Sequence, residues 1–282
     1  MKFRTIFILF NVIIIISFLF IFLLPIFLLG PGSSMAFWRG NWYLALLFIA
    51  LLGGLNSFFL LNSKTFILVE REAWGELSAY LVGLMFPKGR FRSSRVRLLV
   101  NAYLLQSNIE GIERLEAELT SKKPALLRRN ALLFGVTRLL RNKSDEAEAF
   151  FSRFLDAKDV ESRHWLRFDY GFSLVLQKRF VEALPYLDEG TDSRDPVLCL
   201  LAAYLLGSAG ASSTGSETDK ARLLTKVEGV RERLTKRYTM AKWDKEVEQA
   251  KSEVHIVILS RLIDDAGHWL FPGTTVPEGG GA

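Results

Sequence analysis

The stretch YGFSLVLQKRFVEALPYL, residues 170–187, carries the pattern on which the fold of the C-terminal part of this chain depends. Gly171 follows an aromatic residue, Ala183 comes twelve residues later, and the apolar Leu187 comes four residues after that. Residues of the same kinds recur at steps of 36 in both directions along the chain. A fixed period of this length predicts that residues 170–187 are one copy of a repeated helical hairpin.

Several sets of positions share this period. A large apolar residue precedes glycine at Phe134–Gly135, Tyr170–Gly171 and Leu206–Gly207, with Leu98–Leu99 one period earlier. A small residue lies four positions before a bulky one at Gly111 and Leu115, Ala147 and Phe151, and Ala183 and Leu187. Asn108 and Ser144 are in phase and are predicted N-caps of second helices. Such helix pairs cannot bury an apolar face alone, so they stack. The alternative is an irregular helical bundle with chance spacings.

These residues resemble the tetratricopeptide repeat (TPR) family over roughly residues 95–210. The large-then-Gly pairs match its first helix, and Ala147, Ala183, Phe151 and Leu187 match its second. Pro124 and Pro196 match its closing proline, and Phe180 matches its second-helix aromatic residue. The sequence departs from the family in its period of 36 rather than about 34 residues. It also lacks the early tryptophan and has Leu99 in place of the first glycine.

The resemblance implies a concave groove, lined by the first helix of each unit, that holds a peptide or a partner helix. The residues that fall in register with groove positions are Arg129, Leu132, Val136, Trp165, Phe168, Phe172, Leu201 and Tyr204. The two triplets are spaced i, i+3, i+7 and the last pair i, i+3, so each helix presents one stripe, which is apolar and aromatic except for Arg129. Such a stripe suits an amphipathic helix. The alternative is that the C-terminal helices of the same chain fill the groove.

The N-terminal part of the chain is apolar and almost uncharged. Residues 5–38 and 40–63 carry no charged side chain, and Arg39 stands alone between them. Residues 6–29 and 42–61 each reach the roughly 20 apolar residues that a membrane-spanning helix needs. The first run is longer than the core of a signal peptide, although Lys2, Arg4 and the SMA sequence leave that alternative open. We expect two uncleaved spans.

The distribution of basic residues predicts the orientation of these spans. Lys2 and Arg4 precede the first span, Arg39 alone lies between the two, and a basic cluster follows the second. This basic cluster consists of Lys88, Arg90, Arg92, Arg95 and Arg97. We therefore expect a multi-pass protein of the bacterial inner (cytoplasmic) membrane with both ends in the cytoplasm. The basic cluster either contacts anionic lipid or only sets the topology.

The predicted fold class is all-α, with two N-terminal transmembrane helices, a TPR-like α-solenoid of helical hairpins, and C-terminal capping helices. The expected segments are a transmembrane anchor (1–63), an amphipathic and basic juxtamembrane segment (64–94), repeats (95–210), a mobile loop (211–219), two C-terminal helices (220–271) and a disordered tail (272–282).

The sequence contains no motif that predicts catalysis. It has no phosphate-binding loop of the GxxxxGK[ST] type, no HExxH and no CxxC. His164, His255 and His268 are far apart in the chain, and Cys199 lies in an apolar run. The excess of positive charge concentrates beside the spans and not in a nucleic-acid motif. We expect no enzyme activity, no cofactor, no metal and no nucleic-acid partner.

The function that these features predict is a membrane-anchored TPR scaffold for protein–protein interaction or assembly of an envelope complex. In architecture it resembles inner-membrane proteins of the HemY-like family. The alternative is a structural TPR component that faces the periplasm, as in the collar of a flagellar motor. A transport or enzyme subunit would need ionisable groups inside the spans, which are absent. A self-associating homo-oligomer is a third option.

Overall fold

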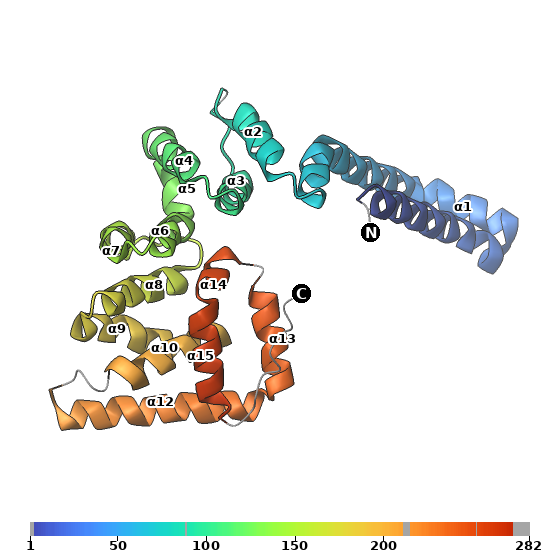
Figure 1. The fold of residues 1–282 in the computed structure, drawn as a ribbon. Coiled ribbons are helices and arrows are strands. Elements are labelled where there is room, and N and C mark those ends of the chain that lie inside the picture. The colour runs from blue at the N-terminus through green and yellow to red at the C-terminus, as the bar shows by residue number, and fades with distance from the viewer. Residues whose placement is uncertain (1–2, 88, 211–214, 252, 273–282) are drawn as a thin grey trace, which may run out of the picture. The chain divides into compact units, whose positions relative to one another are not determined.

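The computed structural model describes residues 3–87, 89–210, 215–251 and 253–272, and the described residues form helices and no strand. The all-α class is therefore confirmed (Figure 1). The chain divides into two compact units, Met1–Leu84 and Met85–Ala282, which are treated separately below. The boundary between the units falls within the predicted juxtamembrane segment 64–94.

The first unit is built mainly from α1 (Phe3–Glu70), which folds back on itself. The helix is broken at Gly30, with φ 76° and ψ 167°, and at Asn41, with φ −121° and ψ 22°. The conformation at Gly30 is one that a side chain would disfavour. Aromatic pairs then join the two halves in antiparallel order. The ring centroids of Phe7 and Phe59 are 5.6 Å apart, and those of Phe18 and Phe48 are 4.3 Å apart.

Both halves of α1 are long and apolar enough to cross a membrane, over Phe7–Leu28 and Phe37–Glu70. Their outward side chains are bulky and apolar, and Phe27 and Leu61 are each 80% exposed. Such a surface is costly in water and suited to lipid. The second half continues to Glu70, seven residues beyond the predicted end of the anchor. The helix expected after Glu70 is α2 (Trp74–Met85), which follows a left-handed Glu72.

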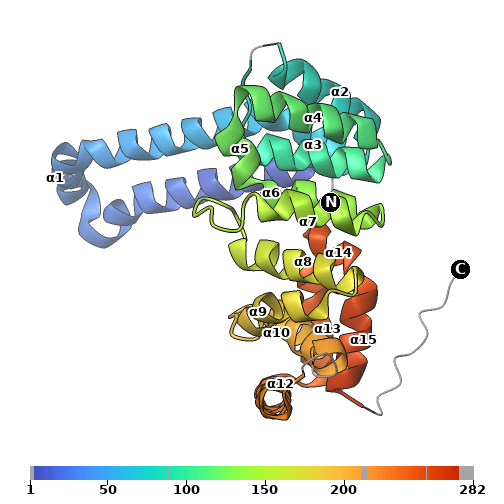
Figure 2. The ribbon, with the colours of Figure 1, turned by 90° about the vertical axis from the view of Figure 1, so that its left-hand side faces the viewer.

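The second unit begins with a succession of helical hairpins. Each first helix packs against its second helix, and α3, α6, α8 and α10 also contact one another in that order (Figure 2). The helices are α3 (Ser93–Leu105), α4 (Ile109–Lys122), α5 (Pro124–Arg129), α6 (Ala131–Leu140), α7 (Ser144–Ser152), α8 (Arg163–Leu176), α9 (Phe180–Gly190), α10 (Pro196–Leu205) and the π-helical η1 (Leu206–Gly210).

The turns inside three of these hairpins have the same backbone structure. Ser107, Asn142 and Lys178 adopt left-handed φ values of 55°, 55° and 62°. After each of them, the next amide donates to the carbonyl five residues earlier, with N···O distances of 2.8, 3.0 and 2.9 Å. This is the Schellman arrangement of helix ends.

The predicted N-cap at Asn108 is confirmed, because its side chain accepts from the Gly111 amide at 2.9 Å. The predicted cap at Ser144 is wrong, because Ser144 is already the first helical residue and Lys143 precedes it.

The small and bulky residues of the repeat lie against each other. A Cβ atom on Gly135 would stand 2.0 Å from the Phe151 ring, and one on Gly171 would stand 2.9 Å from Cβ of Tyr186. Ala147 and Ala183 are fully buried. Pro124 and Pro196 occupy the first position of α5 and α10, where a missing amide hydrogen costs nothing.

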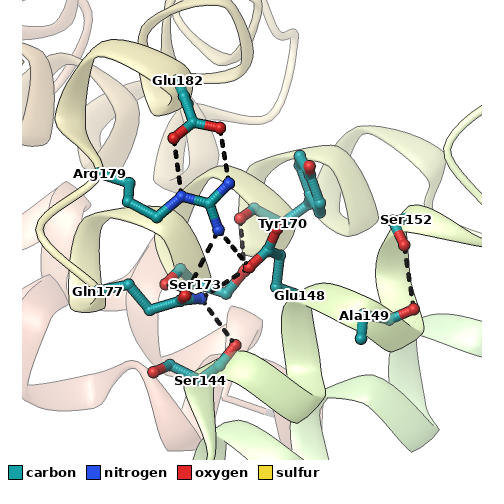
Figure 3. A network of polar contacts seen from close by, with 9 residues as sticks. All are labelled: Ser144, Glu148, Ala149, Ser152, Tyr170, Ser173, Gln177, Arg179 and Glu182. Carbon is teal, nitrogen blue, oxygen red and sulfur yellow. Dashed lines mark hydrogen bonds and ion pairs between the residues drawn. The ribbon is translucent and has the colours of Figure 1, made fainter.

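A polar network ties the third of these turns to the preceding hairpin (Figure 3). Arg179 donates to Glu148 of α7 at 2.6 Å and to Glu182 of α9 at 2.6 Å. Gln177 donates to Glu148 at 3.0 Å and to the Ser144 carbonyl oxygen at 3.2 Å. The turn of one hairpin is therefore fixed to the start of the second helix of its neighbour.

Four helices, rather than the two predicted, follow the repeats within the described part of the chain. They are α12 (Glu217–Arg237), α13 (Met240–Ala250), α14 (Val254–Ile258) and α15 (Ser260–Leu270). The helix α12 begins inside the predicted loop 211–219, with Ser216 accepting from the Asp219 amide at 3.4 Å. Residues 211–214 and 273–282, which hold the rest of that loop and nearly all of the predicted tail, lie outside the described residues.

These C-terminal helices pack back onto the earlier ones. The helix α12 lies against α10 and η1, α15 lies against α10 and α12, and α14 lies against α6. In Figure 1 the red α14 and α15 run across the ends of α8 and α10. They therefore cover part of the face that the first helices present.

Candidate partner-binding site

The second unit contains a cleft where α14 meets the first helices of the hairpins. The larger part of this cleft measures about 680 Å³. A smaller cavity of about 70 Å³ adjoins it, because Ser162, Glu253 and His255 line both spaces. The larger part is also lined by His164, Trp165, Asp192, Ser193, Arg194, Asp195, Leu198, Ala250 and Ile256. The smaller cavity is also lined by Arg97, Asn101, Arg129, Asn130, Leu132, Leu133 and Glu161.

His255 lies at the junction of the two spaces. Its residue is 7% exposed, and its ring meets the Trp165 ring edge to face with centroids 4.8 Å apart. Burial lowers the pKa of His255 to about 4, with the nearby Asp195 charge acting in the opposite direction. The imidazole is therefore neutral at physiological pH. Its Nε2 atom is buried and has no hydrogen-bond partner among the described residues.

Trp165 is held rigidly in the wall of the cleft. Its indole Nε1 donates to Asp195 Oδ2 at 2.8 Å. The other oxygen of Asp195 caps α10, accepting from the Val197 and Leu198 amides at 2.9 and 3.3 Å. The carboxylate thus connects an aromatic wall of the cleft to the start of a buried helix, and this fixes the shape of the site.

The far end of the cleft is polar and contains a second buried atom without a partner. Glu161 pairs with Arg97 at 3.4 Å and with Arg129 at 4.0 Å. Next to them, Asn101 Oδ1 is buried and accepts no hydrogen bond from the described residues. Buried polar atoms are rarely left unpaired in native proteins. Asn101 Oδ1 and His255 Nε2 are thus two buried polar atoms of one cavity that have no hydrogen bond to the described residues.

The structure divides the predicted groove residues into three groups. Arg129, Leu132 and Trp165 line the cleft. Val136, Phe168 and Leu201 are core residues, exposed by 2%, 0% and 0%. The half-buried Phe172 stacks on Phe168, and Tyr204 packs against Trp269 of α15. One open groove across all eight residues is therefore not observed, because α14 and α15 cover much of the stripe. This corresponds to the alternative that the chain fills its own groove.

The basic cluster is also divided. Lys88 lies outside the described residues. Arg90 and Arg92 are exposed before α3, and Arg95 is half-buried within it. Arg97 points to the polar end of the cleft, where it pairs with Glu161. The lipid contact remains a prediction for Arg90, Arg92 and Arg95.

The metal-ligating and thiol side chains of the described residues lie in the following environments. No group of three or more His, Cys, Asp or Glu residues among them could hold a metal ion. Cys199 donates to the Thr191 carbonyl oxygen at 3.1 Å and accepts from Arg233 at 3.1 Å. Burial raises the pKa of its thiol, so Cys199 is a core residue rather than a nucleophile.

The contact between the rings of His255 and Trp165 was not predicted from the sequence. The two residues belong to helices far apart in the chain, and no repeat register connects them. The fold also brings His164 to the same cleft, whereas His268 lines a different pocket, beside α13. The only available indication was the apolar run VHIVIL, which shows that α14 must pack against something.

Comparison with known proteins places the site in a family context. An uncharacterized protein of Treponema pallidum (strain Nichols) is 29% identical over 258 residues, which is 89% of this chain and 81% of that protein. No solved structure matches. The family described as "Uncharacterised Treponema protein" matches residues 111–272, from the start of α4 to the end of α15. This match covers more than half of the chain and includes most of the cleft, so the chain belongs to that Treponema family.

Proposed function

We propose that the protein is a membrane-anchored helical-repeat scaffold that holds a protein partner at the cleft beside His255. The observation that carries the proposal is a pair of buried atoms, His255 Nε2 and Asn101 Oδ1, which line one cavity and have no hydrogen-bond partner among the described residues. A partner segment that enters the cleft would supply the missing hydrogen bonds. No reaction chemistry is required of the site.

The anchor is α1. Its two halves are apolar and carry no charge over residues 5–38 and 40–63, so they suit a fixed hairpin in the bilayer rather than a transport path. The basic residues at both ends favour a domain on the cytoplasmic side of the inner membrane. The alignment with the Treponema pallidum protein covers 89% of the chain. The uncovered part is too short to contain the whole second half of α1, so the alignment includes at least part of that half.

The repeats are proposed to form a divergent TPR-like solenoid. Three identical turns, the close contact of Gly135 with Phe151, and the succession of first helices support this assignment. In such an array the first helices line a concave face. Here α14 and α15 cover part of that face, so the proposed partner site is confined to the cleft at the edge of these helices.

The shape and charge of the cleft favour an extended segment or the end of a helix rather than a whole helix laid along the array. The walls combine the fixed Trp165 ring with the carboxylates of Glu161 and Asp195 and the guanidinium groups of Arg97 and Arg129. A segment with an apolar side chain for Trp165 and a hydrogen-bond donor for Asn101 would fit this surface.

The test is photo-crosslinking of the full-length protein in living cells. A photoreactive amino acid at Leu133, which lines the cleft, should give one discrete adduct with another protein. The same amino acid at Ser152, on the exposed side of α7, should give none. Adding His255→Phe keeps a ring beside Trp165 but removes Nε2, and it should lower the adduct yield about fivefold, as expected for one lost hydrogen bond.

Three results would contradict the proposal. They are equal adducts from Leu133 and Ser152, no adduct from Leu133, and an adduct with the mass of two copies of this chain. The last result would favour a self-associating structural role.

A further inference from the structure

The two halves of α1 enclose an apolar groove of about 470 Å³ beside the chain reversal. Its walls come from both halves of the helix, and they include Phe18, Leu24, Phe37, Trp38, Ala45 and Phe48. This volume lies within the range of about 300–1,000 Å³ that is common for ligand sites. The walls are apolar, and Trp38 is the one lining residue whose side chain carries a polar atom.

The indole N–H of Trp38 is a hydrogen-bond donor without an acceptor in the described part of the chain. Its ring stacks on Phe22 with centroids 4.4 Å apart, so the indole is fixed in the wall of the groove. The Nε1 atom is buried and has no hydrogen-bond partner among the described residues. A buried N–H in apolar surroundings is costly unless an acceptor reaches it. The groove therefore lacks an acceptor at this position.

The next residue supplies a positive charge at the same level. Arg39 is the one charged residue in the sequence between residues 5 and 63, and its side chain is exposed. Both residues lie in the reversal between the breaks at Gly30 and Asn41, where a membrane hairpin meets the headgroup region. An apolar groove, an N–H donor and an exposed guanidinium group thus occur together beside the chain reversal.

We propose that this groove binds a membrane phospholipid. One acyl chain lies against Phe18, Ala45 and Phe48, an ester oxygen accepts from Trp38, and the phosphate pairs with Arg39. The inference rests on the proposed membrane anchor. It does not depend on the partner cleft, which lies in the other unit.

The character of the groove walls favours a lipid over a second helix. Close approach of membrane helices requires small residues at the contact. Here the walls are mostly Phe, Leu, Ile and Trp. Small residues that leave open space occur instead at Gly53 and Gly54, which do not line the groove. A second copy of the chain would therefore be expected at those glycines.

The test is native mass spectrometry of the full-length protein, purified in detergent and mixed with phosphatidylglycerol or with diacylglycerol, which has no phosphate. We expect the wild type to retain phosphatidylglycerol better than diacylglycerol. Trp38→Phe should weaken retention of both lipids about fivefold, as expected for one lost hydrogen bond. Arg39→Gln should remove the preference for phosphatidylglycerol.

Two alanines provide a matched control. Ala45→Phe fills the groove and should abolish retention of either lipid. Ala50→Phe adds the same ring on an exposed position outside the groove and should have no effect. Equal retention by the two phenylalanine variants would overturn the proposal, as would unchanged retention by Trp38→Phe, or wild-type protein that holds both lipids equally. A change of oligomeric state with Ala45→Phe, without loss of lipid, would assign the groove to a second copy.

Fractionation of the same variants separates this proposal from the anchor on which it rests. Wild type and all variants should remain in the membrane fraction after alkaline carbonate extraction. Extraction of the wild type itself would contradict the anchor. Membrane-bound wild type that retains no phosphatidylglycerol would contradict only the lipid site.

Discussion

At the scale of single residues, the hairpins depend on close contacts between small and large side chains. Gly135 lies under the Phe151 ring, which is fully buried and has no room to move away. The sequence allowed this contact to be expected, because both residues recur with the period of the repeat. The sequence did not indicate that Asp169 is buried. A carboxyl group is unusual in a protein core, yet Asp169 is fully buried in α8.

The first prediction concerns Gly135→Ala. The new methyl group would overlap the Phe151 ring, so we expect the free energy of unfolding to fall by about 1–3 kcal/mol. Gly229→Ala in α12 is the matched control, because a Cβ there meets nothing within 4 Å. That variant should gain about 0.5–1 kcal/mol from the better helix propensity of alanine. Thermal unfolding followed by circular dichroism measures both, and a Gly135→Ala protein as stable as the wild type would contradict the packing described.

The second prediction concerns the buried carboxyl group of Asp169. Neither of its oxygens has a partner among the described residues, and burial raises the pKa well above its ordinary value. The folded protein therefore holds the proton more tightly than the unfolded chain, and stability falls as pH rises above the unfolded pKa. Asp169→Asn should raise the free energy of unfolding at pH 7 by about 1–3 kcal/mol.

The pH dependence distinguishes this effect from a general gain in stability. The difference between Asp169→Asn and the wild type should shrink as pH approaches about 4, where the unfolded carboxyl group also binds its proton. Asp264→Asn, on the exposed side of α15, should change little at any pH. A gain that is the same at all pH values would show that charge is not its cause.

At the scale of elements, the sequence predicted the helical hairpins better than it predicted the helices α14 and α15 that pack over them. The positions of α8 and α9 follow from the phase of Gly171 and Ala183, because each hairpin packs mainly on its neighbours. The placement of α14 and α15 depends on contacts between distant parts of the chain, and no periodicity encodes these. The groove prediction did not anticipate that Trp165 would contact His255 and that Tyr204 would contact Trp269.

The third prediction concerns the attachment of α14. Because the pKa of His255 is lowered to about 4, the unfolded chain binds a proton at pH values where the folded protein does not. The stability that the neutral His255 contributes is fully present above about pH 6.5, and it should therefore be lost as the pH falls from there towards 4. At about 1.4 kcal/mol per pKa unit, the loss from this one group is of the order of 3 kcal/mol.

This effect should disappear when the titrating ring is removed. His255→Gln should show a smaller loss of stability between pH 7 and 4.5 than the wild type does, measured by urea unfolding at each pH. His268→Gln, at an exposed position on α15, should behave as the wild type does. If His255→Gln lost as much stability as the wild type over this range, His255 would not be the group responsible.

At the scale of the whole molecule, the chain combines two apolar helices long enough to cross a membrane with a unit of helical hairpins, and the last helices of that unit pack on the first ones. The apolar composition of residues 5–63 made the two long apolar helices predictable, because a membrane-spanning helix needs about 20 such residues. The same reasoning gave the expected orientation from the basic residues. It could not give the cleft, which exists only where the last helices return to the first ones.

The most direct test of the membrane-anchored account is the accessibility of two single cysteines from outside the cell, each in a Cys199→Ser background. Met35→Cys lies in the reversal of α1, where Met35 is 65% exposed, and Ser152→Cys lies on the exposed side of α7. With the outer layer made permeable, a membrane-impermeant thiol reagent should label Met35→Cys, whereas Ser152→Cys should react only after lysis. The reverse pattern would contradict the cytoplasmic orientation, and equal accessibility of the two positions would contradict the membrane-spanning hairpin itself.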